Sequence, residues 1–435
     1  MFFDQSSEPQ VARDARFLAE AVPGDPAPAS PEVLQACLVE LGMVMHEVGF
    51  ASHEIEGHAA RVANVFGTDA EVFATPTALF LGVGPREDQR TLLLRLEPAD
   101  DDLDGMGRVL EAVRGVEQGD VSPAGLLARI RSVRSHRARP TRVSERVAWL
   151  LAFAVSCGGA AALLGGGARD AIATVALSLV AAVASQALPS PWTPALRYCL
   201  VAAISAMGAS MAGRLGWIDA PDVVTLSAII IFLPGLSLTR ALADLARRDL
   251  AAGTARLMGA LTTFLALGLG LAVGHAVTEG LGALANLPIP AASEVITPTW
   301  LKVLAAIITP PALAIILHAP WRHVPAIAVG TLLASLGTQG GSSLLGPHLG
   351  VGLGTLALGL FANVWARGRP RRHPATVLVP GLILLVPGTM GLQSLELLMS
   401  AQTVDGIHIA FETVWTAGAL VAGLLVANAI APAET

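Results

Sequence analysis

The sequence has few charged residues and few cysteines. Only 14% of its 435 residues are Asp, Glu, Lys or Arg, whereas a soluble globular chain usually carries about a quarter. Its three cysteines, Cys37, Cys157 and Cys199, lack the paired spacing of a disulfide framework or a zinc site. We therefore expect reduced cysteines that pack as small apolar residues, and neither a metal nor a cofactor.

Catalytic sequence motifs are also missing. The chain contains no G-x-S-x-G elbow, no phosphate-binding loop, no intramembrane-protease G-x-G-D and no zinc pattern. These absences argue against a hydrolase and against an ATP-driven pump, so we expect a protein that is not an enzyme. The net charge of −6 argues against nucleic acid as a partner, because such binding needs a basic face.

The charges are distributed unevenly along the chain. Met1–Arg146 contains 15 Arg and 23 acidic residues, whereas Val147–Thr435 contains 13 basic and 11 acidic residues over nearly twice the length. This division predicts an acidic soluble domain followed by an apolar domain. Met1–Glu20 has no apolar stretch typical of a signal peptide, so we expect the soluble domain to stay in the cytoplasm.

The soluble part reads as a small α+β domain over residues 31–140. The Pro-rich segment Pro23–Pro31 predicts that residues 1–30 form a mobile tail. The patterns that follow predict a helix with a break near Gly49, two strands of a hairpin and two more helices. These elements are Pro31–Phe66, Glu71–Val83, Thr91–Glu97, Leu103–Gln118 and Ser122–Val133.

Ten apolar runs follow, each near the length of about 20 residues that a helix needs to cross a bilayer. We expect an all-α polytopic membrane domain with a first repeat over residues 141–277, an outer loop over 278–300 and a second repeat over 301–430. The runs are Val147–Leu164, Ala168–Leu188, Leu196–Leu215, Val223–Ala243, Thr254–Val277, Leu301–Leu317, Ala326–Ser343, Leu349–Ala366, Thr376–Leu398 and Ile407–Ile430.

Positive charge predicts the orientation of these spans. Seven Arg lie between Arg129 and Arg146, directly before the first run. With the N-terminus inside, the later inner loops carry ten basic residues and the outer loops carry three, namely Arg169, Arg214 and Lys302. Basic residues stay on the cytoplasmic side. We expect a multi-pass protein of the bacterial inner membrane with both termini in the cytoplasm.

The two groups of five spans suggest an inverted repeat. Five is an odd number, so the second group starts on the outer side and has the opposite orientation, a common plan in secondary transporters. The fourth run contains Leu233-Pro234-Gly235, and the ninth contains Val386-Pro387-Gly388. Both runs are broken by Pro-Gly at corresponding places.

The Pro-Gly breaks are the candidate substrate site. A break frees backbone groups that lipid cannot satisfy, so it persists where it lines a protein cavity, and its free N–H and C=O groups suit an amino-acid zwitterion. The alternative is that the kinks only shape packing. The candidate substrate-binding residues are Pro234, Gly235, Ser237, Thr239, Pro387, Gly388 and Thr389. The candidates for proton coupling are the ionisable residues Asp244, Glu396 and Glu412.

These motifs resemble the threonine/serine exporter family. The resemblance rests on Phe232–Leu245 with its L-P-G, on the Asp249–Gly253 D-x-x-x-G link to a glycine-rich span, and on Leu385–Gly388 in the second half. The family's G-A-x-x-x-R-[IV]-E helix is matched only in part, because Phe50 and Glu54 replace its Ala and Arg.

The resemblance covers nearly the whole chain and implies export of threonine, serine and similar small solutes, driven by the proton gradient. The partners that follow from these expectations are the lipid bilayer, protons and a small amino-acid substrate. A second copy of the chain remains an open alternative as a partner. A membrane-embedded enzyme or a sensor that works through its N-terminal domain is the alternative function.

Overall fold

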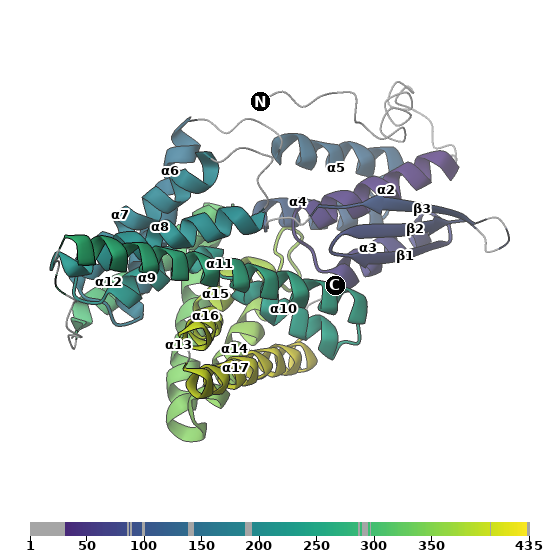
Figure 1. The fold of residues 1–435 in the computed structure, drawn as a ribbon. Coiled ribbons are helices and arrows are strands. Elements are labelled where there is room, and N and C mark those ends of the chain that lie inside the picture. The colour runs from purple at the N-terminus through teal and green to yellow at the C-terminus, as the bar shows by residue number, and fades with distance from the viewer. Residues whose placement is uncertain are drawn as a thin grey trace. The chain divides into compact units, whose positions relative to one another are not determined.

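The computed structural model divides after Pro140 into two compact units, which are described separately (Figure 1). The structure describes residues 31–84, 87, 89–97, 101–137, 143–187, 194–285, 288, 295, 297–400 and 402–432. The predicted mobile tail of residues 1–30 lies outside the described residues, as do residues 286, 287, 289–294 and 296 of the predicted outer loop.

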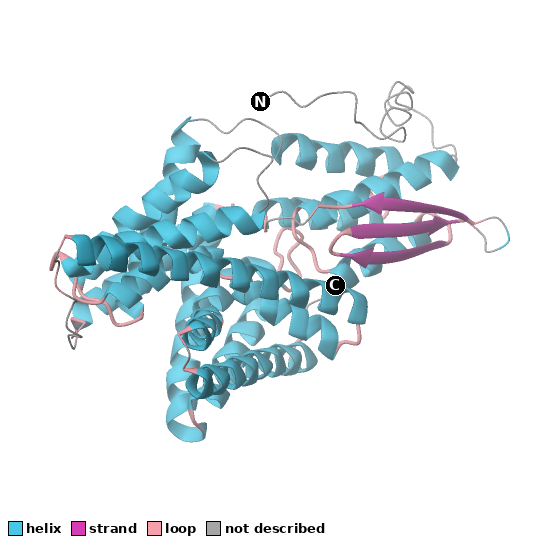
Figure 2. Ribbon diagram, viewed as in Figure 1, coloured by secondary structure: helices cyan, strands magenta, loops and turns pink. Residues whose placement is uncertain are grey.

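The described residues of the first unit form four helices and one three-stranded antiparallel sheet in the order β1-β2-β3 (Figure 2). Its helices are α2 (Pro31–Glu47), α3 (Ser52–Val65), α4 (Leu103–Glu117) and α5 (Pro123–Arg137), and its strands are β1 (Ala70–Thr75), β2 (Ala78–Val83) and β3 (Arg90–Arg95). The predicted elements of residues 31–137 therefore form, with one correction in the sheet.

The predicted break near Gly49 is confirmed. Helix α2 ends at Glu47, and Gly49 adopts a left-handed backbone with φ of +98° that side chains disfavour. The next helix begins three residues later. The Ala51 amide donates to the Glu54 carboxylate at 2.9 Å and closes the first turn of α3.

The prediction of a two-stranded hairpin was wrong. The run Glu71–Val83 is not one strand but two, because a tight turn at Pro76 and Thr77 reverses the chain between β1 and β2. The Thr75 hydroxyl holds this turn, since its oxygen accepts from the Ala78 amide at 3.0 Å. Three apolar side chains, from Phe73, Phe80 and Leu93, stand in register on the exposed face of the sheet.

The second unit is entirely helical where it is described. Its first half contains α6 (Val143–Leu163), α7 (Ala168–Ala187), α8 (Pro194–Arg214), α9 (Pro221–Ala228), η4 (Ile230–Phe232), α10 (Gly235–Ala246) and α11 (Leu250–Leu284). Its second half contains α12 (Thr299–Ile316), η5 (Trp321–His323), α13 (Val324–Leu345), α14 (Pro347–Ala366), α15 (Ala375–Leu385), α16 (Gly388–Met399) and α17 (Thr403–Ile430).

Eight helices or helix pairs of the described chain are long and apolar enough to cross a membrane, and the bent pair of α9 with η4 and α10 makes a ninth. The protein is therefore an all-α, multi-pass membrane protein in this unit. The remaining predicted span corresponds to α13, which is 22 residues long but includes the polar residues Thr338, Gln339 and Ser342. The count of ten spans stays a prediction. One boundary was wrong, because α11 continues to Leu284 where a loop was expected from residue 278.

The two halves keep one constant spacing of 153 residues. Helix α8 begins at Pro194 and α14 at Pro347, and the helix breaks fall at Pro234 and Pro387. The same spacing relates α6 to α12 and α11 to α17. The sequences of the two halves can therefore be aligned over these helices without an insertion or a deletion.

Helix contacts are matched in the same way. The pairs α6–α7, α7–α8, α8–α11 and α10–α11 of the first half correspond to α12–α13, α13–α14, α14–α17 and α16–α17 of the second. Close contacts agree in detail. A Cβ built on Gly253 would lie 2.7 Å from Leu245 Cγ, and a Cβ built on Gly406, 153 residues later, would lie 2.7 Å from Leu398 Cγ.

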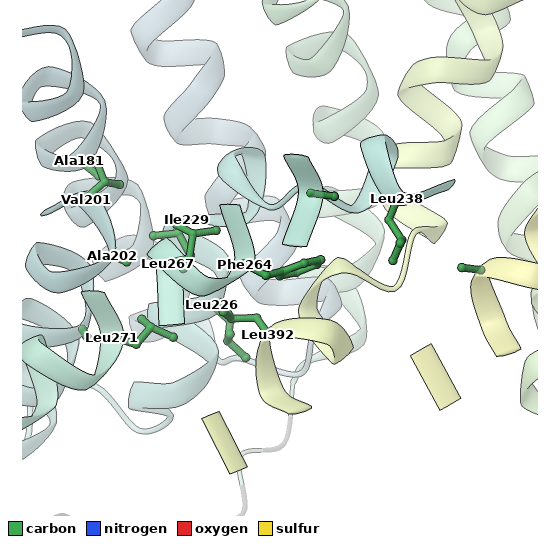
Figure 3. Close-up of a cluster of buried hydrophobic side chains, with 13 residues drawn as sticks. Ala181, Val201, Ala202, Leu226, Ile229, Leu238, Phe264, Leu267, Leu271 and Leu392 are labelled. Carbon is green, nitrogen blue, oxygen red and sulfur yellow. The ribbon is translucent and has the colours of Figure 1, made fainter. Parts of the chain in front are cut away.

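The largest apolar cluster of this unit joins both halves (Figure 3). Leu226 and Leu238, on either side of the first break, lie in one cluster with Phe264 of α11, Leu392 of α16 and Ala417 of α17. Because lipid tails are as apolar as leucine, close van der Waals packing rather than removal from water holds such a cluster together. The cluster therefore fixes how the broken helices sit against the unbroken ones.

Cys37 gives a chemical test of the packing in the first unit. It is fully buried on α2, with its sulfur 3.6 Å from the Pro123 carbonyl oxygen at the start of α5. Burial raises the pKa of the Cys37 thiol to about 12. Because the thiolate is the nucleophile, Cys37 of the folded protein stays protonated and unreactive at neutral pH.

We expect a Cys157→Ala/Cys199→Ala variant, which keeps only Cys37, to resist alkylation by maleimide at about pH 7.5 and to react fully in denaturant, where the thiol pKa returns to about 8.5. Mass spectrometry of the intact protein measures the extent of labelling. Equal labelling rates with and without denaturant would show that α2 and α5 do not pack as described.

Candidate functional site

The two Pro-Gly breaks have nearly the same backbone conformation. Leu233 has φ and ψ of −67° and 129°, and Val386 has −69° and 136°. The following prolines, Pro234 and Pro387, have −80° and 31°, and −79° and 40°. In both places an extended residue before a proline ends one half-helix, as the clash between the proline ring and the preceding residue dictates.

Each break starts a new helix of the same length. Helices α10 and α16 both contain 12 residues, and the first pair of half-helices is bent by 51°. The hydrogen bonds of the new helices begin with the Leu238 amide to the Pro234 carbonyl at 2.9 Å and the Gly391 amide to the Pro387 carbonyl at 3.1 Å. The N–H groups of the first turn therefore have no partner within their own helix.

The breaks lie directly against each other. A Cβ built on Gly235 would be 3.1 Å from Gly388 Cα and would overlap the Val386 side chain. A Cβ built on Gly388 would be 3.2 Å from Leu233 Cβ and 3.5 Å from Gly235 Cα. The glycines thus allow two backbones to touch, and the structure brings Pro234, Gly235, Pro387 and Gly388 together as one buried crossing.

The predicted hydroxyl residues are placed differently from one another. Thr239 is buried, and its hydroxyl donates to the Gly235 carbonyl oxygen at 3.1 Å, within the first turn of α10. Thr389 is half-buried and follows the second break directly, whereas Ser237 is exposed. Two of the three hydroxyl residues are therefore at least partly enclosed beside the crossing.

The surroundings of the crossing are apolar. Leu238 belongs to the cluster of Figure 3 and Leu233 packs against it, whereas Leu236 and Val386 pack against a second cluster built on α13, α14, α15 and α17. A polar solute here would depend on backbone groups and a few hydroxyls for its hydrogen bonds. Because the ends of four half-helices meet, both positive N-terminal ends and negative C-terminal ends are present within a few ångströms.

The three predicted proton-coupling carboxylates have partners of different kinds. Asp244 is buried and forms an ion pair with Arg256 across α10 and α11, at 3.2 Å. Glu396 on α16 lies 3.5 Å from His275 on α11, and Glu412 on α17 lies 3.8 Å from His348 on α14. The constant spacing pairs Asp244 with Leu397 rather than with Glu396, so the first two carboxylates are not equivalent positions.

Sequence reasoning did not identify the histidines as partners of these carboxylates. His275 and His348 lie near span ends, where loop solvation is the ordinary expectation, and their partners are far away along the chain. His275 contacts Ser210 through Nδ1 at 3.1 Å, and His348 contacts Thr416 at 2.8 Å. Ser210 can be placed beside His275 only when the constant spacing and the packing of α8 against α11 are known.

Within the described ranges, no group of three or more His, Cys, Asp or Glu side chains gathers in a way that could hold a metal ion.

Comparison with known proteins agrees with these features. A family model described as a putative threonine/serine exporter matches residues 36–278, and a second model, described as a threonine/serine exporter, matches residues 302–430. A protein of Corynebacterium glutamicum named threonine/serine exporter is 24% identical over 287 residues, which are 65% of this chain and 58% of that protein. The chain thus spans less than two thirds of that relative's length. No solved structure is significantly similar to the chain. The first family model alone matches more than half of the sequence, and this chain belongs to the threonine/serine exporter family.

Proposed function

We propose that this protein is a secondary exporter that moves threonine, serine and similar small amino acids out of the cytoplasm, across the bacterial inner membrane. The observation that carries the proposal is the buried crossing of two Pro-Gly breaks in a chain of this family. The family assignment favours a transporter over the alternative of a membrane-embedded enzyme or sensor.

The inverted repeat is part of this proposal. It is supported by the spacing of 153 residues, by the matched helix contacts and by the matched backbone at the two breaks. If each half crosses the membrane five times, the second half starts on the opposite side and faces the other way. Two halves of opposite orientation that meet at one site can rock about it and expose it to each side in turn.

The orientation follows from charge. Arg247 and Arg248, between α10 and α11, and Arg367–Arg372, between α14 and α15, lie at the ends that the positive-inside rule assigns to the cytoplasm. Both termini are then cytoplasmic, and the first unit, over residues 31–137, is cytoplasmic as well. Helix breaks at mid-span place the proposed site away from both surfaces.

The crossing suits an amino-acid zwitterion. The N–H groups at the starts of α10 and α16 favour a carboxylate, and the carbonyl groups at the ends of η4 and α15 favour an ammonium group. Thr389 and Thr239 supply hydroxyl oxygens beside these backbone groups. A hydroxyl on the substrate side chain then has a partner, which is the chemistry that separates threonine and serine from alanine or valine.

We propose the proton gradient as the driving force. Glu396 and Glu412 each contact a histidine, and Asp244 is a buried carboxylate between two helices of the first half. Such ionisable groups are the usual carriers of protons through helical transporters. Any of the three can bind a proton during the cycle, and the contacts of Glu396 are developed below.

We expect cells or vesicles loaded with labelled threonine to lose it at a rate that depends on this protein and that collapses when an uncoupler is added. The reason is that export against a gradient needs the free energy of proton entry. The measurement is retained radioactivity over time, with cells that lack the protein as the control. Efflux that is insensitive to the uncoupler would contradict proton coupling, and no efflux of any small amino acid would contradict the exporter itself.

We expect Gly235→Leu to abolish threonine efflux, because any side chain at Gly235 overlaps Val386 and separates the two breaks. The matched control is Gly259→Leu on α11, where a Cβ would meet nothing within 4 Å. Both variants should insert in the membrane in equal amounts, as immunoblots of membrane fractions measure. If Gly235→Leu transports threonine as fast as the control, the two breaks serve only helix packing.

A further inference from the structure

His275 and Glu396 form a contact between the two halves of the membrane unit. His275 lies on α11 of the first half and Glu396 on α16 of the second, with Nε2 and Oε1 3.5 Å apart. The other ring nitrogen, Nδ1, is 3.1 Å from the Ser210 hydroxyl on α8. The imidazole thus has an oxygen partner on each side, and a protonated ring can donate to both.

The contact of His275 with Glu396 has no equivalent in the other half of the repeat. The residues 153 positions after Ser210 and His275 are Asn363 and Asn428, and they also contact each other, with the Asn363 amide donating to Asn428 Oδ1 at 2.8 Å. The position equivalent to Glu396 is Ala243. The second half therefore uses two amides that do not titrate where the first half uses a histidine, and only the histidine faces a carboxylate.

The titratable contact lies at one end of the unit. His275 is 25 residues beyond the start of α11, about 38 Å along the helix at 1.5 Å per residue, and Glu396 is three residues before the end of α16. This is the end away from the arginines that flank α10 and α11. In the proposed orientation it is the outer side, whereas the Asn363–Asn428 contact lies toward the cytoplasm.

Acidic residues surround His275 on this side. Glu396 on α16, Asp222 in the first turn of α9 and Glu279 on α11 itself all act on it as negative charges. Arg214 of α8, a helix packed against α11, has its guanidinium beside Gly282, nearly two turns further along. The side chains of His275 and Glu396 are 31% and 41% exposed, so the protein itself does not enclose them.

We propose that His275 and Glu396 form a proton-binding site that closes the outer side of the exporter. A proton from the outer solution adds to the imidazole, which then donates to the Glu396 carboxylate from Nε2 and to the Ser210 hydroxyl from Nδ1, so that a charged pair joins α11 to α16. Loss of the proton to the same solution leaves a neutral ring, a weaker contact, and halves that separate more easily on this side.

This inference rests on the proposed function for its orientation and for its role in the cycle, but it concerns a contact that can be measured without transport. Leu392 of α16 is fully buried one turn from Glu396 toward the crossing, in the apolar cluster that includes Leu267 and Leu271 of α11. A cysteine at this position is reached from outside only when the two helices part. The rate at which this cysteine is labelled from outside therefore measures how readily α11 and α16 part on the outer side.

The experiment uses Leu392→Cys in a chain without its three natural cysteines. A membrane-impermeant maleimide is added outside at about pH 5.5 and at about pH 8. These values lie on either side of the ordinary histidine pKa of about 6.5. The full chain is in right-side-out vesicles, and rates are compared with those of the same chain carrying His275→Asn, the residue that the repeat itself uses at the equivalent place. Because both chains carry the same thiol, the ratio of rates removes the pH dependence of the maleimide reaction.

We expect His275→Asn to label roughly fivefold faster than its parent at the lower pH and at a similar rate at the higher pH. Glu396→Gln should give the same pattern. The control is His318→Asn, at the opposite end, where the left-handed backbone with φ of 53° accepts asparagine. This control should match the parent at both pH values.

The proposal that protons control this contact is wrong if the ratio of labelling rates is the same at both pH values. It is also wrong if only one of His275→Asn and Glu396→Gln changes the ratio. Threonine counterflow, the exchange of labelled for unlabelled threonine without a gradient, is measured on the same vesicles. If the parent shows no counterflow but the ratio of labelling rates depends on pH, the exporter is rejected and the His275–Glu396 contact is kept. Counterflow with a constant ratio would reject the contact and keep the exporter.

Discussion

The membrane unit depends on one constraint, which is that backbone N–H and C=O groups cannot be left unpaired in lipid. A helix opened by Pro-Gly exposes such groups in the middle of a span, so it must be covered by protein. Here each break covers the other, with Gly235 against Gly388 and apolar side chains from neighbouring helices around them. The same arrangement leaves a few polar groups in a place that lipid does not reach, which is what a site for a small zwitterion requires.

Local sequence patterns were sufficient for the parts of the fold that local chemistry decides. The Pro-Gly pairs at Pro234 and Pro387 end their helices, and the helix before Gly49 ends at Glu47, so the sequence predicts all three breaks. The turn at Pro76 does not stand out in the sequence, because it lies within an apolar run rich in Val, Phe and Thr, which favour strands. The end of α11 was placed too early because the residues after Val277 include Glu279 and several glycines, yet the helix continues.

The candidate site could be predicted only in part. The proline and glycine residues of both breaks were found from the sequence, because each break is a local signal and the two are alike. The hydroxyl residues were harder, since a helix position alone does not say that Ser237 is exposed and Thr239 buried. The contact of Glu396 with His275 depends on two helices from different halves, and nothing local to either residue points to the other. The constant spacing of the halves does not supply this contact either, because the position equivalent to Glu396 is Ala243.

The equal lengths of α10 and α16 set the depth of the crossing. With 12 residues in each helix, the start of each lies about 18 Å from its far end, close to half the thickness of a bilayer with its polar surfaces. Under the proposed function, a substrate at the crossing has a path inward about as long as its path outward. The two matched halves alone then give transport no preferred direction. Direction must come from the few positions where the halves differ and from the gradient that acts on them.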